Sequence, residues 1–149
     1  MQHVEVSRVI AATPQRVYEL VSDLPRMGEW SPEATGGKWV KGATGPAVGA
    51  RFKGTNRKGR IRWSTAVKVV TAEPGNEFAF DVAAMGFGVA RWGYRMEAVD
   101  GGTKVTEYWD DHRNWVVAKL TGFVLSVPDR ATHNATTMEQ TLANVAAAV

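Results

Sequence analysis

The amino-acid sequence contains no cysteine, which excludes disulfides, thiolate metal sites and a cysteine nucleophile. It also lacks a long hydrophobic run. The longest, residues 115–127, is interrupted by Lys119 and is shorter than the roughly 20 residues that cross a bilayer. Residues 1–15 hold no apolar stretch of the kind found in signal peptides. We therefore expect a cytoplasmic protein without a transmembrane segment.

Acidic residues are missing from the stretch between Arg51 and Ala72, which carries seven lysines and arginines. Such a patch could bind nucleic acid or contact an anionic membrane surface transiently. Most of these cations alternate with apolar residues, so in strands they would form one solvated outer wall that discourages aggregation. We expect no aromatic side chain on that wall to stack on bases, and therefore no nucleic-acid partner.

The common catalytic and cofactor motifs are absent as well. The three histidines, His3, His112 and His133, do not form a metal-binding pair at helical or strand spacing. Two acids precede His112, but a solvated strand end explains them better than a metal or acid–base site. The sequence has no G-x-S-x-G motif, and its glycine-rich stretches at 42–50 and 86–91 lack the phosphate-loop and dinucleotide-binding patterns. We assign no metal, cofactor or catalytic residue.

What the sequence does contain is a series of short strands punctuated by turns. Residues 60–70 (RIRWSTAVKVV) alternate, with Ile61, Trp63, Thr65, Val67 and Val69 on one face. Similar strands are predicted at 3–11, 38–41, 50–55, 77–83, 89–99 and 103–111. Glycine-containing turns separate them, which is typical of an antiparallel meander.

Helical periodicity marks both sides of this meander. Thr13 and Pro14 are typical of a helix start, apolar residues then recur at helical spacing, and Pro25 ends the helix. Residues 25–32 suggest a second short helical turn. Near the C-terminus a stripe of about five turns is predicted to cover the dry face of the sheet; its members are Ala131, Ala135, Met138, Leu142, Val145 and Val149. The whole chain, 1–149, is predicted to be a single α+β domain.

Several segments follow one another in a characteristic order: an opening strand, ATPQRVYELVSD, MGEWSPE, GARFKG, EPGNEFAF, ARWGYRMEAVDGGTKVTEYW and the C-terminal amphipathic helix. In this order they resemble the START/Bet v 1-like superfamily (SRPBCC; polyketide cyclase/dehydrase and lipid-transport-like), in its bacterial branch. The resemblance implies a helix-grip fold, in which a curved antiparallel sheet wraps around a long helix and leaves a hydrophobic cavity. Members of the superfamily bind lipids, sterols or polyketides, and some catalyse cyclisation or aromatisation.

We therefore expect a hydrophobic or amphipathic ligand, bound or transported in an internal cavity whose apolar walls hold a few polar groups. The alternatives are a polyketide cyclase, aromatase or dehydratase using acid–base groups in that cavity, and an interaction protein with a filled core. The predicted ligand-binding residues are Phe52, Trp63, Phe80, Trp92, Tyr94, Glu107, Trp109, Phe123 and Met138.

Among them, Glu107 is expected to be buried with a raised pKa, either meeting a ligand or pairing with an inward-pointing arginine. Asn56 and Thr65 are further inward candidates, and Arg91 would join them if the strand register differed by one residue. Residues 115–127, apolar nearly all round, could form a gate, a dimer interface or a membrane-contacting helix. A monomer and a homodimer both remain open.

Overall fold

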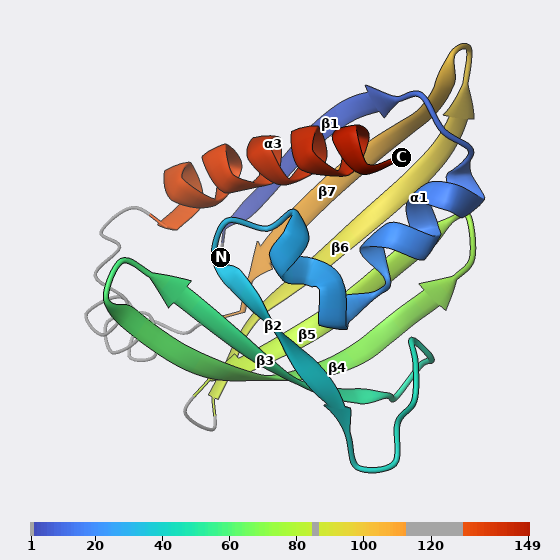
Figure 1. The fold of residues 1–149 in the computed structure, drawn as a ribbon. Helices are drawn as coiled ribbons and strands as arrows, with labels where there is room; N and C mark the ends of the chain where they lie inside the picture. The colour runs from blue at the N-terminus through green and yellow to red at the C-terminus, as the bar shows by residue number, and fades with distance from the viewer. Residues whose placement is uncertain (1, 85–86, 113–129) are drawn as a thin grey trace.

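The computed structural model describes residues 2–84, 87–112 and 130–149. Within these ranges, seven strands form one antiparallel sheet in the order β1-β7-β6-β5-β4-β3-β2. Their bounds are His3–Ile10 (β1), Ala34–Val40 (β2), Arg51–Lys58 (β3), Ile61–Glu73 (β4), Glu77–Ala84 (β5), Phe87–Val99 (β6) and Gly102–Asp111 (β7). Strands β2 to β7 are a meander, and β1 pairs with β7 at the edge (Figure 1). The predicted meander and element order are confirmed.

The main difference from the predicted strands is at β2, which begins at Ala34 rather than at residue 38. The sequence TGG at 35–37 is typical of a turn, but Gly36 and Gly37 lie in the strand with φ of 129° and 145°. Only glycine adopts such angles readily. A Cβ at Gly37 would also lie 2.6 Å from Cζ of Phe52, so the missing side chain makes room for that ring.

The helices begin and end close to the predicted residues. Helix α1 spans Pro14–Val21, and the Thr13 hydroxyl accepts a hydrogen bond from the Arg16 backbone N–H at 3.1 Å. A 3₁₀ helix, η1 (Leu24–Glu29), follows directly. The long helix α3 spans Arg130–Ala148. Its predicted stripe is buried at three central positions, whereas Val149 lies beyond the helix end and is exposed; the buried members are Met138, Leu142 and Val145.

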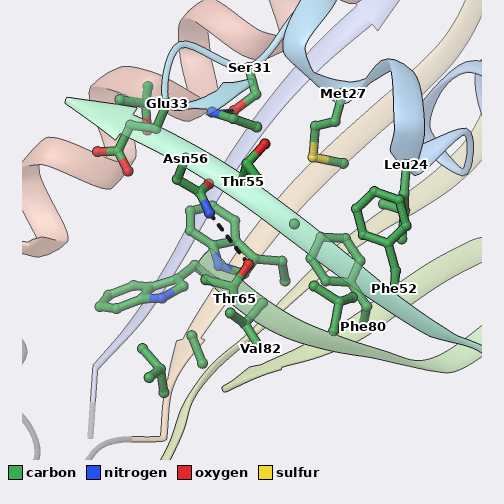
Figure 2. Close-up of a pocket in the computed structure, with 18 of the residues that line it drawn as sticks. Leu24, Met27, Ser31, Glu33, Phe52, Thr55, Asn56, Thr65, Phe80 and Val82 are labelled. Carbon is green, nitrogen blue, oxygen red and sulfur yellow. Dashed lines mark hydrogen bonds between the residues drawn. The ribbon is translucent and has the colours of Figure 1, made fainter. Parts of the chain in front are cut away.

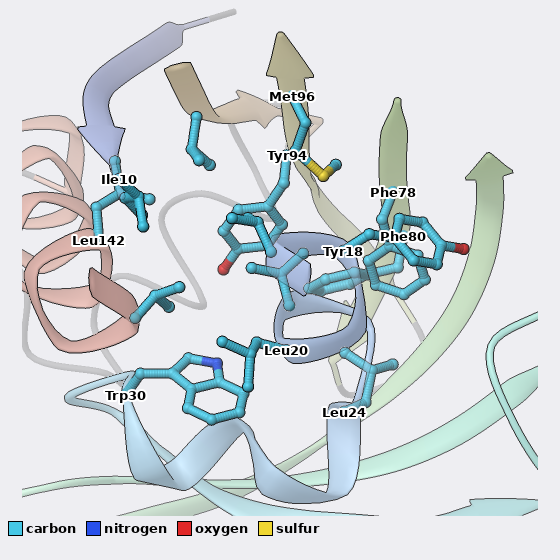
Figure 3. Close-up of a cluster of buried hydrophobic side chains, with 14 of the residues drawn as sticks. Ile10, Tyr18, Leu20, Leu24, Trp30, Phe78, Phe80, Tyr94, Met96 and Leu142 are labelled. Atoms are coloured by element: carbon cyan, nitrogen blue, oxygen red, sulfur yellow. The ribbon is translucent and has the colours of Figure 1, made fainter. Parts of the chain in front are cut away.

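The concave face of the sheet is divided into a hollow half and a solid half. The hollow half borders β3 to β7 and contains the cavity shown in Figure 2. The solid half is a hydrophobic core in which Ile10, Leu20, Tyr94 and Leu142 pack together from a strand edge, α1, β6 and α3 (Figure 3). Helix α3 packs chiefly on β1 and lies over both halves.

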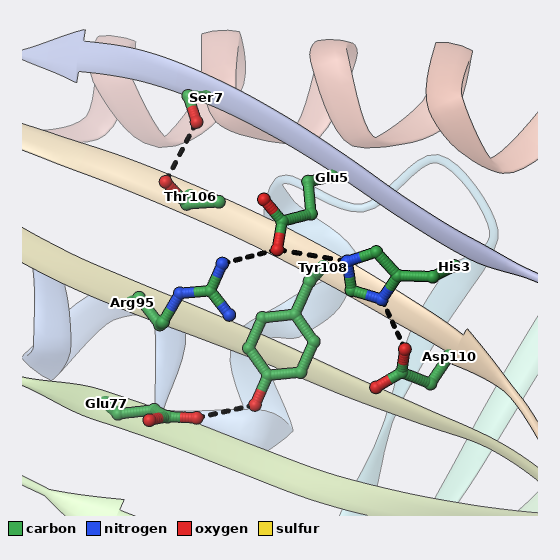
Figure 4. Close-up of polar contacts among 8 residues, drawn as sticks. All are labelled: His3, Glu5, Ser7, Glu77, Arg95, Thr106, Tyr108 and Asp110. Atoms are coloured by element: carbon green, nitrogen blue, oxygen red, sulfur yellow. Dashed lines mark hydrogen bonds and ion pairs between the residues drawn. The ribbon is translucent and has the colours of Figure 1, made fainter.

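On the outer face of the sheet, the Tyr108 ring covers a glycine of the neighbouring strand. Gly93 is its direct partner in the β6–β7 register, and the Tyr108 hydroxyl donates a hydrogen bond to Glu77 Oε2 at 2.6 Å. The Arg95 guanidinium lies 4.8 Å from the ring centroid and reaches Glu5 on β1 at 2.5 Å (Figure 4). These contacts connect four strands, β1, β7, β6 and β5, by side chains as well as by the backbone ladder.

The predicted basic wall also lies on the outer face. Its cations are exposed, apart from a half-buried Lys58. Arg51 faces Lys68 across the β3–β4 pair, and Arg57 faces Arg62. Like charges directly opposite each other destabilise a sheet, so exposure to water is the environment that best accommodates them. That the wall binds no nucleic acid stays a prediction.

The close contact at Gly93 predicts a stability effect. A Cβ on this residue would lie 2.2 Å from Cζ of Tyr108, so Gly93→Ala must push the ring off the sheet. We expect a loss of about 1–3 kcal/mol in the free energy of unfolding, measured by urea denaturation. Gly88→Ala is the matched control, because it lies on the same strand and nothing is within 4 Å of its added Cβ. Equal effects of the two variants would contradict this account.

Candidate functional site

The cavity lies between the concave face of the sheet, the η1–β2 segment and α3, and has a volume of about 150 Å³. Each surrounding element contributes side chains to it, and most of those side chains are apolar. Among the lining residues are Leu24, Met27, Ser31, Glu33, Phe52, Asn56, Trp63, Thr65, Val67, Phe80, Val82, Ala90, Trp92, Tyr94, Glu107, Trp109, Asn134, Thr137 and Thr141.

The apolar wall is built mainly from aromatic rings on neighbouring strands. Trp92 and Trp109 are partners in the β6–β7 register, and their ring centroids are 6.4 Å apart. Phe80 is the partner of Trp92 on the other side, in β5. Phe52 in β3 packs edge-on against Trp39, at 5.3 Å between centroids. The strand alternation thus brings rings from distant parts of the sequence to one surface, as Figure 2 shows for Phe52 and Phe80.

A buried carboxyl group is the most unusual polar feature of the cavity. Glu107 is only 3% exposed, and its Oε1 accepts a hydrogen bond from the Tyr94 hydroxyl at 3.1 Å. Burial raises the pKa of Glu107 from 4.5 to about 8, and the Tyr94 hydrogen bond offsets only part of this effect. The group is therefore mostly protonated and uncharged at pH 7.

Among the described residues, no arginine neutralises the Glu107 carboxyl, which was one of the two interpretations of the sequence. Its side-chain partner among the described residues is Tyr94. Arg91 points to the outer face of the sheet, where it forms an ion pair with Asp81 at 2.6 Å. The register therefore excludes the alternative that placed Arg91 in the cavity.

Helix α3 adds polar side chains that sequence reasoning missed. Asn134, Thr137 and Thr141 line the cavity, and their i, i+3, i+7 spacing was a detectable signal of one helical face. The two threonine hydroxyls donate to the helix backbone, Thr141 to the carbonyl of Thr137 at 2.8 Å and Thr137 to that of Asn134 at 3.0 Å. Asn134 is 2% exposed, and no partner for its Nδ2 is found in the part of the chain that the structure describes.

Several sequence-predicted residues occupy the expected surface: Phe52, Trp63, Phe80, Trp92, Tyr94, Glu107 and Trp109 all line the cavity. Asn56 and Thr65 also point into it, and Asn56 Nδ2 donates to Thr65 Oγ1 at 3.4 Å. Met138 packs beside Ala90 and Trp109 in a hydrophobic cluster. Phe123 and the whole segment 115–127 lie outside the described residues. That these side chains bind a ligand stays a prediction.

None of the three histidines is among the residues that line the cavity. His3 contacts Asp110 and Glu5 on the outer face (Figure 4), His112 is exposed, and His133 bonds Glu33. Across residues 2–84, 87–112 and 130–149, no three histidine or acidic side chains are grouped as a metal site would require. None of the helices in these ranges is both long and apolar enough to span a bilayer.

Comparison with known proteins gives one family match and many structural neighbours. The model of the family described as "Polyketide cyclase / dehydrase and lipid transport" matches residues 1–149. A polyketide-cyclase-like protein from Corynebacterium glutamicum is 33% identical, with a TM-score of 0.53, and the match covers 98% of this chain and 83% of that one. No functionally curated protein matches the sequence.

Two neighbours of lower identity share the fold. The major latex-like protein 151 of Panax ginseng has a TM-score of 0.71 at 12% identity, over 99% of this chain and 96% of that one. The di-domain ARO/CYC protein StfQ, from the steffimycin biosynthetic pathway, has a TM-score of 0.76 at 12% identity. That match covers 97% of this chain and 49% of StfQ.

The buried Glu107 carboxyl predicts a particular pH dependence of stability. Because its pKa rises from 4.5 to about 8 on folding, the folded protein holds this proton more tightly than the unfolded chain. The stability from this group is complete below about pH 4.5 and is lost progressively as the pH rises toward 8. Glu107→Gln keeps an oxygen for Tyr94 but cannot ionise. Relative to this variant, the wild-type protein should therefore lose a few kcal/mol across that interval.

Urea unfolding of both proteins at several pH values between 5 and 9 measures this difference. Glu97→Gln, at an exposed position on β6, is the control for removing a glutamate as such. A gap between wild type and Glu107→Gln that stays constant over the whole pH range would show that Glu107 does not titrate in this way.

Proposed function

The chain belongs to the polyketide cyclase/dehydrase and lipid transport family, and on this basis we propose that it binds a hydrophobic or amphipathic small molecule in the cavity. The ligand would be lipid-like, sterol-like or polyketide-like, and the protein would hold or transport it. The observation that carries this proposal is an apolar cavity lined by two buried polar atoms, Glu107 Oε2 and Asn134 Nδ2, that have no partner among the described residues.

The energetics of such a cavity favour a binding role over a purely structural one. A hollow of this kind forfeits packing contacts, and each buried polar atom without a partner costs roughly 1–3 kcal/mol. A ligand that fills the space restores the contacts and contributes roughly 25 cal/mol per Å² of apolar surface that it buries. Apolar cavities of about 150 Å³ accept a benzene-sized molecule, so a cavity volume of about 150 Å³ supports the binding of a ring-sized apolar group.

A second candidate function is catalysis, and the Glu107–Tyr94 pair is the observation that favours it. A protonated carboxyl group in an apolar cavity can donate a proton to a substrate oxygen, and after ionisation it can accept one. Such a group would suit a cyclase, an aromatase or a dehydratase. The family description covers both this chemistry and lipid transport, so membership alone does not choose between them.

Filling the cavity tests the binding proposal. Val82 lines the cavity on β5, and Val82→Trp should occupy much of the volume and reduce affinity at least tenfold. The probe is N-phenyl-1-naphthylamine, a neutral dye that fluoresces in apolar surroundings. Val9→Trp is the matched control, because Val9 is 56% exposed on β1. Native mass spectrometry of the purified wild type checks for a co-purified ligand. Unchanged dye affinity in a folded Val82→Trp protein would contradict the proposal.

A linear poly-β-ketone mimic separates binding from catalysis. We expect the wild-type protein to bind the mimic without accelerating its cyclisation. Chromatography monitors the cyclisation, and a protein-free sample is the control. If the protein is instead an enzyme, it will accelerate the reaction, and Glu107→Gln will lower that rate by about 10²–10⁴-fold with nearly unchanged affinity. If Glu107→Gln accelerates the cyclisation as much as the wild type does, Glu107 does not take part in catalysis.

A further inference from the structure

Two buried polar atoms of residues that line the cavity have no hydrogen-bond partner within the described ranges: Glu107 Oε2 and Asn134 Nδ2. They come from different elements, β7 and α3, and both residues line the same cavity. Both side chains are almost completely buried, at 3% and 2% exposure. Buried polar atoms are nearly always paired in folded proteins, so two orphans lining one cavity indicate that a bound molecule supplies the partner.

Both atoms can donate a hydrogen bond to a bound molecule. Nδ2 of Asn134 belongs to an amide NH₂ group and can only donate. The Glu107 carboxyl is mostly protonated at pH 7, because burial raises its pKa to about 8. Its Oε1 already accepts the Tyr94 hydroxyl, which leaves Oε2 to carry the proton. The complementary ligand group is therefore a hydrogen-bond acceptor.

The charges around the cavity disfavour an anionic ligand. Its titratable lining residues among those described are Glu107 on β7, Tyr94 on β6 and Glu33, and none is a lysine or an arginine. Glu33 bonds His133 of α3. The side chains of α3 that line the cavity, Asn134, Thr137 and Thr141, are uncharged. A carboxylate placed beside Glu107 would lie in an apolar environment to which the described residues contribute no cation, which is strongly unfavourable.

We propose that the cavity selects uncharged ligands that present a carbonyl-type oxygen to Glu107 and Asn134, and that it discriminates against carboxylates. This proposal rests on the proposed function, since it assumes that the cavity binds a small molecule. It narrows the ligand class to ketones, esters or quinones with an apolar ring, and it excludes free fatty acids with the head group buried. Specificity of this kind arises because a ligand without the acceptor leaves both donors unpaired.

Three naphthalene derivatives of similar shape test the proposal at pH 6.5: 2-acetylnaphthalene, 2-ethylnaphthalene and 2-naphthoate. The first compound presents a carbonyl acceptor, the second presents no polar group, and the third presents a carboxylate. Binding is measured by isothermal titration calorimetry. We expect the ketone to bind about 5–10-fold more tightly than the ethyl compound, which corresponds to roughly one net hydrogen bond. The naphthoate should bind at least tenfold more weakly than the ketone.

Two variants connect the selectivity to the named atoms. Asn134→Leu has a similar volume but no donor, and it should reduce the ketone's advantage over the ethyl compound to about twofold or less. In the wild type, ketone affinity should fall as the pH rises through about 8, because ionised Glu107 has no proton to donate. Glu107→Gln keeps an amide donor, so it should bind the ketone with affinity independent of pH between 6.5 and 9.

The outcomes separate this proposal from the function on which it rests. If none of the three compounds binds, the proposed function itself fails. If the ethyl compound binds as tightly as the ketone, or the naphthoate binds best, the cavity binds ligands but the selectivity proposed here is wrong. If a folded Asn134→Leu protein still prefers the ketone over the ethyl compound as strongly as the wild type does, Asn134 does not recognise the ligand.

Discussion

A side chain on a strand can point to only one of the two faces of the sheet. The cavity depends on the pairing register of β3 to β7, which places their inward-pointing side chains side by side. Trp109, Trp92 and Phe80 form one row across three strands, and Glu107, Tyr94 and Phe78 form the next row. A shift of one residue in β6 would replace Trp92 by its neighbour Arg91 and bring a cation into the cavity. Backbone pairing thus determines the apolar wall and keeps the cations of the described strands on the outer face.

Helix α3 determines where the concave face is solid and where it is hollow. One side of the helix carries Asn134, Thr137 and Thr141, which line the cavity, and also Met138, Leu142 and Val145, which are buried in apolar clusters. Leu142 and Val145 fill the core beside Ile10, whereas the three polar side chains face the cavity. A single helix therefore contributes both to the structural core and to the candidate binding region.

The sequence was sufficient to predict the fold and most of the apolar wall, because both follow from periodicity. Alternation of period two placed Phe52, Trp63 and Phe80 on the inner face without knowledge of any contact. Asn134 was missed because a polar residue on a helix does not reveal whether it faces water or a cavity. The contributions of Met27 and Glu33 were also missed, since the η1–β2 segment has no periodic signal and its position depends on packing against the finished sheet.

The buried Glu107 carboxyl is difficult to explain as a device for stability alone. A glutamate retained for the fold would be expected to have a cation or several donors around it, because a carboxyl with few partners is costly to bury. Here the described side chains provide one hydrogen bond, from Tyr94. The desolvation that destabilises the charged form keeps the group protonated, and a protonated carboxyl is a hydrogen-bond donor that apolar surroundings strengthen. The same burial therefore accounts for the cost of Glu107 to the fold and for the hydrogen-bond donor that our proposal assigns to ligand recognition.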